Sequence, residues 1–128
     1  MQKRPLILVV DDDPTLRMLL EFILRRQYRV VMREDGLDAM RWMTAGNLPD
    51  VILADYEMPH LNGLGLLQQV KASGLLGGIP VLILTGHESQ ELTRTCMAAG
   101  AFAYLLKPFN PDQVLARIAS ALSLSVAA

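Results

Sequence analysis

The chain has 128 residues, a length that suits one domain with one hydrophobic core. Hydrophobic residues make up 52% of the chain and charged residues 20%, which excludes an intrinsically disordered segment. The formal net charge of −1 leaves no overall basic excess, so we expect no direct binding of nucleic acid or of an anionic membrane.

The N-terminal segment does not have the pattern of an export signal. Its apolar run, Leu6 to Val10, is too short for the core of a signal peptide and is followed at once by acids. No apolar run approaches the roughly 18 residues that cross a bilayer. The single cysteine, Cys96, cannot form an internal disulfide, which fits a reducing compartment. We therefore expect a cytoplasmic protein.

Short apolar runs predict five strands, at residues 6–10, 29–33, 51–54, 81–85 and 102–106. Three of these runs are apolar throughout, which is typical of strands that are buried on both faces of a parallel sheet. The run at 29–33 has an arginine at each end, so it fits a position nearer the edge of the sheet.

The segments between the runs have helical periodicity. The first helix has an apolar stripe formed by Leu16, Leu19, Leu20, Ile23 and Leu24, and the last has one formed by Val114, Leu115, Ile118 and Leu122. Asn110 and Pro111 have the pattern of an N-cap followed by proline at the first helical position. Gly100 fits the C-cap of the fourth helix. The remaining helices are expected near residues 36–46, 62–73 and 88–99.

This strict alternation of strands and helices predicts an α/β fold with a doubly wound parallel sheet, right-handed crossovers and helices on both faces. We expect a single domain over residues 1–128, with its core at about 5–122. Residues 123–128 are expected to form a frayed tail or the start of a linker.

Groups that bind metal or phosphate follow four of the five predicted strands: Asp11 and Asp12, Asp55, Thr85, and Lys107. Ligands of open α/β sheets bind at the carboxyl ends of the strands, where these residues should meet. Carboxylates this close are stable only with a cation between them or with raised pKa values, and Mg²⁺ prefers such oxygen ligands. One carboxylate could instead attack phosphorus, while Lys107 and Thr85 contact the phosphoryl oxygens.

The segments "LILVVDDDPTLRMLL", "PDVILADYEMPHLNGLGLL", "VLILTG" and "AGAFAYLLKPF" together resemble the receiver domain of two-component response regulators. The resemblance covers about residues 5–122 and implies a flavodoxin-like sheet with strand order 2-1-3-4-5. It also implies that Asp55 accepts a phosphoryl group from a histidine kinase or a histidine phosphotransfer protein.

The resemblance further implies a role for each site residue. Asp12 would bind Mg²⁺, or Mn²⁺, directly, Asp11 would bind it through water, and Asp55 and the backbone carbonyl of Glu57 would complete the protein ligands. Thr85 and Lys107 would contact the phosphoryl group. Tyr104 would change rotamer with Thr85 and so switch an output face formed by the fourth helix, the fifth strand and the fifth helix. The peptide bond between Lys107 and Pro108 would be cis.

Four residues need a separate interpretation. Asp13 precedes a proline that begins a helix, so we expect it to be an N-cap. Glu57 and His87 would flank the phosphoryl group and set the rate of dephosphorylation, although both could equally be solvated side chains without effect. Gly65 falls early in the third helix, where glycine costs about 1 kcal/mol relative to alanine, and the sequence offers no reason for it.

Two other functions fit part of the sequence. The run "VVDDDPT" also fits the first motif of haloacid-dehalogenase-like phosphatases, with Asp11 as nucleophile and Asp13 as acid and base. That reading leaves Asp55 unexplained and lacks the acidic motif expected after Lys107. A pseudo-receiver that binds partners without phosphorylation is the second alternative, but such domains usually lack part of the site. The output partner, or a C-terminal output domain missing from this sequence, stays unknown.

Overall fold

The computed structural model describes residues 3–127, and side chains for residues 3–123. The strands are β1 (Leu6–Val10), β2 (Arg29–Arg33), β3 (Val51–Asp55), β4 (Val81–Thr85) and β5 (Ala103–Leu106). The helices are α1 (Pro14–Leu24), α2 (Gly36–Thr44), α3 (Gly63–Ala72), α4 (Gln90–Ala98) and α5 (Pro111–Ala127). Strands and helices alternate along the chain, as the hydrophobic pattern predicted.

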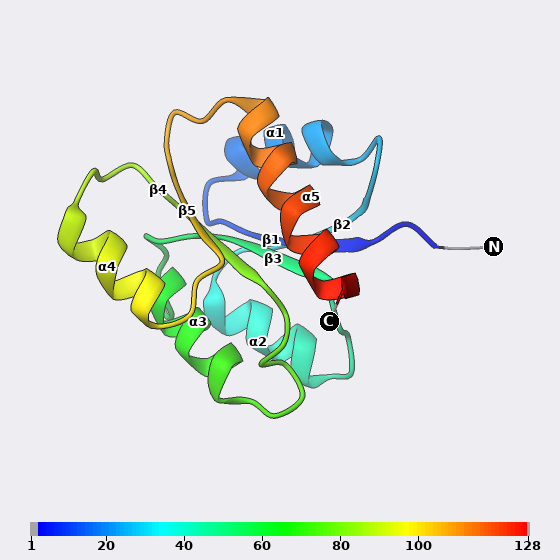
Figure 1. Ribbon diagram of the computed structural model, residues 1–128, viewed down its shortest axis with the longest axis horizontal. Coiled ribbons are helices and arrows are strands. Elements are labelled where there is room, and N and C mark those ends of the chain that lie inside the picture. The colour runs from blue at the N-terminus through cyan, green and yellow to red at the C-terminus, as the bar shows by residue number, and fades with distance from the viewer. Residues whose placement is uncertain (1–2, 128) are drawn as a thin grey trace.

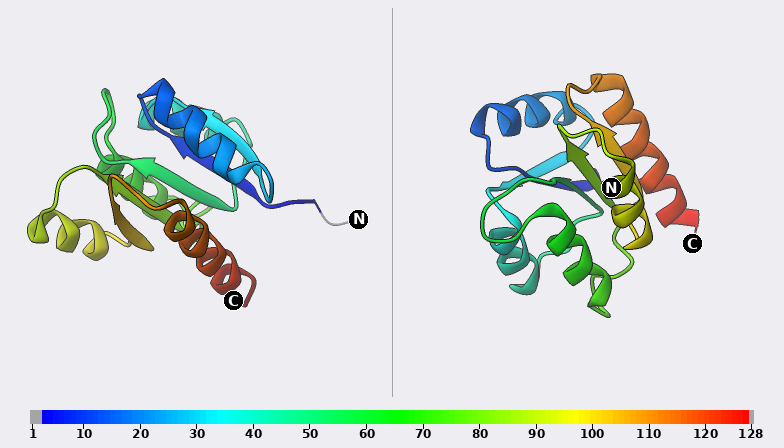
Figure 2. Two further views of the ribbon diagram at one scale, coloured as in Figure 1. Left: turned by 90° about the horizontal axis from the view of Figure 1, so that it is seen from above. Right: turned by 90° about the vertical axis from the view of Figure 1, so that its left-hand side faces the viewer.

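The strands form one parallel sheet in the order β2-β1-β3-β4-β5, which confirms the predicted topology. Figure 2 shows the sheet from above in its left view, with β2 and β5 at the two edges. The direction in which successive strands are added to the sheet reverses at β1, because β2 lies on one side of β1 and β3 lies on the other. In such a sheet the crevice for ligands lies at the carboxyl ends of β1 and β3.

Helices α1 and α5 cover one face of the sheet, and α2, α3 and α4 cover the other (Figure 1). Successive residues of a strand point to opposite faces, so each central strand contributes to two cores. In β1, Ile7 and Val9 pack toward α1 and α5, while Leu8 and Val10 pack toward α2 and α3. All four are fully buried, which explains why this strand is apolar without alternation.

Side chains cap the N-termini of the helices. Asp13, Asp35, Asn62 and Ser89 each accept a backbone N–H from the first turn of α1, α2, α3 and α4, respectively. Asn110 Oδ1 accepts the N–H of Asp112 at the start of α5. The caps at Asp13 and Asn110 were predicted from the sequence, whereas those at Asp35, Asn62 and Ser89 were not.

The C-terminal end of α4 agrees with the sequence-based prediction, whereas that of α5 extends beyond it. Gly100 has φ of 106° and ends α4, as its position predicted. The backbone of α5 continues to Ala127, into the segment predicted to be a tail or linker. Residue 128 and the side chains of residues 124–127 lie outside the described part, so that interpretation stays a prediction. Among the described helices, none is long and apolar enough to cross a membrane.

Candidate functional site

Three carboxylates meet at the carboxyl ends of β1 and β3. The register pairs Val10 with Ala54, so the residues that follow, Asp11 and Asp55, lie side by side. One ligand oxygen from each of Asp11, Asp12 and Asp55 lies within 4.8 Å of the others. Asp11 and Asp55 are buried, with exposed fractions of 1% and 6%, whereas Asp12 is open to solvent. The cluster therefore has a buried floor and one solvent-facing carboxylate.

Asp11 is the least satisfied of these groups. Its Oδ1 accepts the N–H of Asp13 at 2.9 Å, but its buried Oδ2 has no hydrogen-bond partner among the described residues. Lys107 Nζ lies 3.6 Å from Oδ2, which is an ion pair but too long for a good hydrogen bond. Burial raises the pKa of Asp11 to about 6, although the bond from Asp13 opposes the shift. A buried carboxylate oxygen without a donor fits a cation ligand.

Lys107 holds Asp55 by a direct ion pair, with 2.8 Å between Nζ and Oδ1. Burial raises the pKa of Asp55 even though this lysine opposes the shift. Burial alone would lower the pKa of Lys107, but the hydrogen bond to Asp55 and the charges of both aspartates raise it. The lysine therefore remains a cation next to the carboxylates. The Lys107–Pro108 peptide bond is cis.

Thr85 and Tyr104 are connected through the backbone of one residue, His87. Thr85 is buried at the end of β4, and its Oγ1 accepts the N–H of His87 at 3.1 Å. The hydroxyl of Tyr104, on β5, donates to the carbonyl of His87 at 3.3 Å. The loop between β4 and α4 is thus linked both to the buried Thr85 at the end of β4 and to the partly buried Tyr104 on β5.

The side chains of Glu57 and His87 meet at the mouth of the site. His87 Nε2 contacts Glu57 Oε1, and both side chains are more than half exposed. Glu57 also lines a shallow depression of about 420 Å³ together with Asp12, Tyr56, Met58 and Asn62. The Glu57 carboxylate therefore lies near the cluster but is engaged by His87, and it is not one of the three grouped carboxylates.

Asp13, the third acid of the opening run, does not belong to the cluster. Its Oδ1 accepts the N–H of Thr15 at 2.9 Å and caps α1. The phosphatase alternative requires this carboxylate as an acid and base at the reacting centre. Because the helix engages Asp13 instead, the geometry does not favour that alternative.

The sequence reasoning missed Arg17, which contacts the backbone of the site. Its Nη1 donates to the carbonyl oxygen of Asp11 at 2.6 Å. The bond holds the peptide group that joins Asp11 to Asp12, the two acids of the cluster that follow β1. The available signal was an arginine in the second turn of a helix that follows an acidic run, which is too common a pattern to identify such a contact.

Comparison with known proteins identifies the family to which the sequence belongs. The family model for the response regulator receiver domain matches residues 7–119. The DNA-binding transcriptional regulator NtrC of Escherichia coli is 35% identical over 122 residues, which cover 94% of this chain and 25% of NtrC. The chain thus spans only about a quarter of that relative.

Solved structures agree in both fold and sequence. A putative response regulator from Chloroflexus aurantiacus has a TM-score of 0.89 and 33% identity, and the superposition covers 94% of this chain and 99% of that protein. The chemotaxis response regulator CheY4 of Vibrio cholerae has a TM-score of 0.85 and 30% identity, with coverage of 94% and 100%. The similarity therefore extends over nearly the whole fold, including all strand ends that form the site.

Proposed function

Because this chain belongs to the family of response regulator receiver domains, we propose that it accepts a phosphoryl group on Asp55 and acts as a signalling switch. The observation that carries the proposal is the pairing of Asp55 with Lys107 beside the unsatisfied oxygen of Asp11. One nucleophile, one fixed cation and one site for a metal ion are the groups that phosphoryl transfer to a carboxylate requires.

The residues present fit Mg²⁺, with Mn²⁺ as an alternative. Asp11, Asp12 and Asp55 would hold the ion together with the backbone carbonyl of Glu57, and the buried Oδ2 of Asp11 would gain a charged partner, directly or through water. When bound, the ion would neutralise part of the negative charge on the incoming phosphoryl oxygens.

The reaction would use the carboxylate of Asp55 as nucleophile. A carboxylate oxygen attacks phosphorus, the P–N bond of a phosphohistidine breaks, and the product is an acyl phosphate with the imidazole as leaving group. Lys107 is already 2.8 Å from Asp55, so its ammonium needs only a small movement to pair with a phosphoryl oxygen. The protein would thus catalyse its own phosphorylation, and hydrolysis of the acyl phosphate would reset it.

Thr85 and Tyr104 would transmit the change to the output face. The Oγ1 of Thr85 accepts a bond from His87, and its own hydrogen remains available for a phosphoryl oxygen. Movement of Thr85 toward that oxygen would disturb the His87 backbone, to which Tyr104 also bonds. Tyr104 lines a depression of about 360 Å³ between α4 and β5, where an output partner would detect its rotamer.

The phosphodonor would be a histidine kinase or a histidine phosphotransfer protein. Several curated relatives are longer proteins, including a hybrid signal transduction histidine kinase of Dictyostelium discoideum, of which this chain covers 8%. We propose that the chain works in a two-component pathway in the cytoplasm, either with a separate output partner or as part of a longer chain.

Mass spectrometry of the intact protein tests this function. Wild type incubated with acetyl phosphate and Mg²⁺ should gain the mass of one phosphoryl group, and omission of Mg²⁺ should greatly reduce the gain. Asp55→Asn should gain none under the same conditions. A wild type that gains no mass, with Mg²⁺ and with a phosphorylated histidine phosphotransfer protein as a second donor, would favour a pseudo-receiver.

A further inference from the structure

Gly65, which the sequence left unexplained, faces the side chain of Leu61. A Cβ placed on Gly65 would lie 2.5 Å from Leu61 Cδ1 and 3.4 Å from Leu61 Cγ. Real Cβ atoms do not approach other atoms at 2.5 Å, so any larger residue would displace this leucine. The glycine is required for space and not for its backbone conformation, because it lies within the regular helix α3.

A second glycine accommodates the same leucine from the opposite helix. At Gly36, the first residue of α2, an added Cβ would lie 2.5 Å from the carbonyl oxygen of Leu61 and 3.0 Å from its Cβ. The N–H of Gly36 donates to that carbonyl at 3.0 Å. Leu61 is therefore seated between the first turns of α2 and α3, and at both sides the neighbour is a residue without a side chain.

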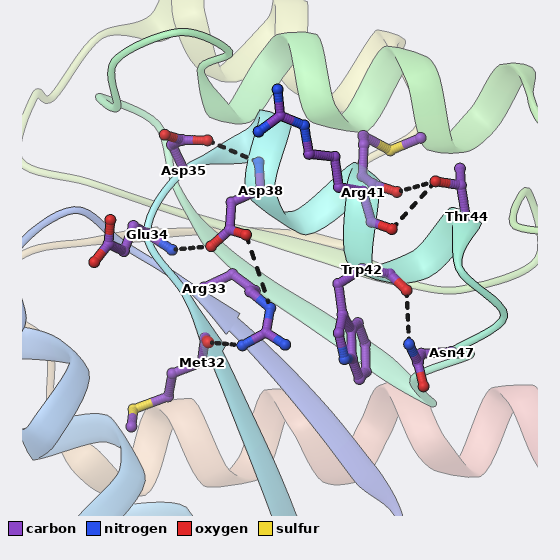
Figure 3. A network of polar contacts seen from close by, with 10 residues as sticks. Met32, Arg33, Glu34, Asp35, Asp38, Arg41, Trp42, Thr44 and Asn47 are labelled. Atoms are coloured by element: carbon purple, nitrogen blue, oxygen red, sulfur yellow. Dashed lines mark hydrogen bonds and ion pairs between the residues drawn. The ribbon is translucent and has the colours of Figure 1, made fainter.

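The start of α2 is itself held firmly, so it can serve as an anchor. Figure 3 shows the polar contacts around it. Asp35 Oδ1 accepts the N–H of Asp38 at 2.8 Å, and Asp38 Oδ2 accepts the N–H of Glu34 at 3.2 Å. The guanidinium of Arg33 lies over the ring of Trp42, 5.5 Å from its centroid. These contacts join the end of β2 to α2 just before Gly36.

Leu61 lies at the end of the loop that carries the Glu57 carbonyl. The loop leaves β3 at Tyr56, whose N–H donates to the carbonyl of Leu84 at 2.7 Å, and it reaches Leu61 five residues later. Between these points His60 has φ of 68°, in the left-handed region that a residue other than glycine rarely adopts. Such a conformation persists only where its neighbours fix it, and Leu61 is the next residue along the chain.

We propose that Leu61, seated between Gly36 and Gly65, is a positioning residue that fixes the loop after Asp55 and thereby sets the affinity of the site for Mg²⁺. This inference rests on the proposed function, because it assigns the Glu57 carbonyl to the metal. It gives a reason for the glycine in the first turn of α3, despite the low helix propensity of glycine. It also links the β2–α2 connection to the reaction centre.

Isothermal titration of Mg²⁺ into the full chain tests the proposal with two glycine variants. In Gly65→Ala the new Cβ meets the flexible end of Leu61, so the protein should fold while the leucine turns away from its seat. We expect the Mg²⁺ dissociation constant to rise by roughly tenfold, the scale seen when groups behind a metal ligand are lost. Gly74→Ala is the matched control, because an added Cβ there meets nothing within 4 Å, and its dissociation constant should stay unchanged.

Leu61→Ala provides a second, independent variant. It should weaken Mg²⁺ binding to a similar degree, and adding Gly65→Ala to it should have no further effect, because the space is then free. Equal Mg²⁺ affinity in wild type, Gly65→Ala and Leu61→Ala would overturn the inference and leave the proposed function intact. A wild type that binds no Mg²⁺ would overturn both.

Hydrogen exchange gives a readout in the absence of metal. The amide of Gly36 should be protected in wild type and in Gly74→Ala, because it donates to Leu61. Its exchange should become faster in Gly65→Ala and Leu61→Ala. If the Gly36 amide exchanges at the wild-type rate in both variants, the position of the Leu61 backbone does not depend on the packing of its side chain. That result would also contradict the proposal.

Discussion

The side chain of His87 contacts that of Glu57 and joins the loop after β3 to the loop after β4. We infer that this contact restricts the access of water to an acyl phosphate on Asp55. We therefore predict that Glu57→Ala and His87→Ala each shorten the lifetime of the phosphorylated protein several-fold. The decay of the phosphorylated species, followed by intact mass, measures this.

A double variant shows whether Glu57 and His87 act through their contact or independently of each other. If the pair acts as a unit, Glu57→Ala with His87→Ala should decay no faster than either single variant. Glu91→Ala, which removes an exposed acid from the first turn of α4, serves as the control. Wild-type decay rates in both single variants would contradict a role for this pair.

The raised pKa of Asp11 predicts how the stability of the metal-free protein depends on pH. The folded protein holds a proton on this group up to about pH 6, whereas the unfolded chain releases it near the ordinary value of 3.8. Between these values the folded state binds more protons, so the free energy of unfolding decreases as pH rises. The full shift corresponds to roughly 3 kcal/mol at most, at 1.36 kcal/mol per pKa unit.

Denaturant titration at pH 5 and pH 7.5 checks this. Metal-free Asp11→Asn should lose that part of the pH dependence and should be more stable than wild type at pH 7.5. Mg²⁺ should stabilise wild type more at pH 7.5 than at pH 5, because at the lower pH it must displace a proton from Asp11. Equal stabilisation at both values would argue against Asp11 as part of the metal site.

Lys107 is predicted to act in the transfer step. Lys107→Met removes the one cation that contacts the Asp55 carboxylate among the described residues. Loss of such a charge from a transition state commonly costs about 10²-fold in rate, so phosphorylation by acetyl phosphate should slow by that order. Lys3→Met, a change at an exposed lysine, should react at the wild-type rate. A wild-type rate in Lys107→Met would remove this lysine from the mechanism.

Asp13 should contribute to stability and not to the chemistry. Asp13→Ala removes the cap of α1 and should lower the free energy of unfolding by about 1 kcal/mol. Asp13→Asn keeps a capping oxygen and should be nearly neutral. Both variants should be phosphorylated at the wild-type rate, whereas a large loss of phosphorylation in Asp13→Asn would revive the phosphatase alternative.

The sequence predicted the sheet and most of the site because both depend on where apolar runs stop. Asp55 and Thr85 are the last residues of β3 and β4, and Asp11 and Lys107 directly follow β1 and β5. Parallel pairing alone therefore brings these four residues to one edge of the sheet. The contact between Glu57 and His87 could not be predicted in this way, since it depends on the paths of two loops. The contact of Gly65 with Leu61 could not be predicted either, since it depends on the rotamer of the leucine.

The proposed function requires that Asp55 carries the phosphoryl group. The most direct measurement is to trap the acyl phosphate after reaction with acetyl phosphate and Mg²⁺, digest the protein, and locate the modified aspartate by tandem mass spectrometry. We predict a single modified residue, Asp55, in wild type and in Asp13→Asn. Modification of Asp11 or Asp13, with Asp55 unmodified, would contradict the account.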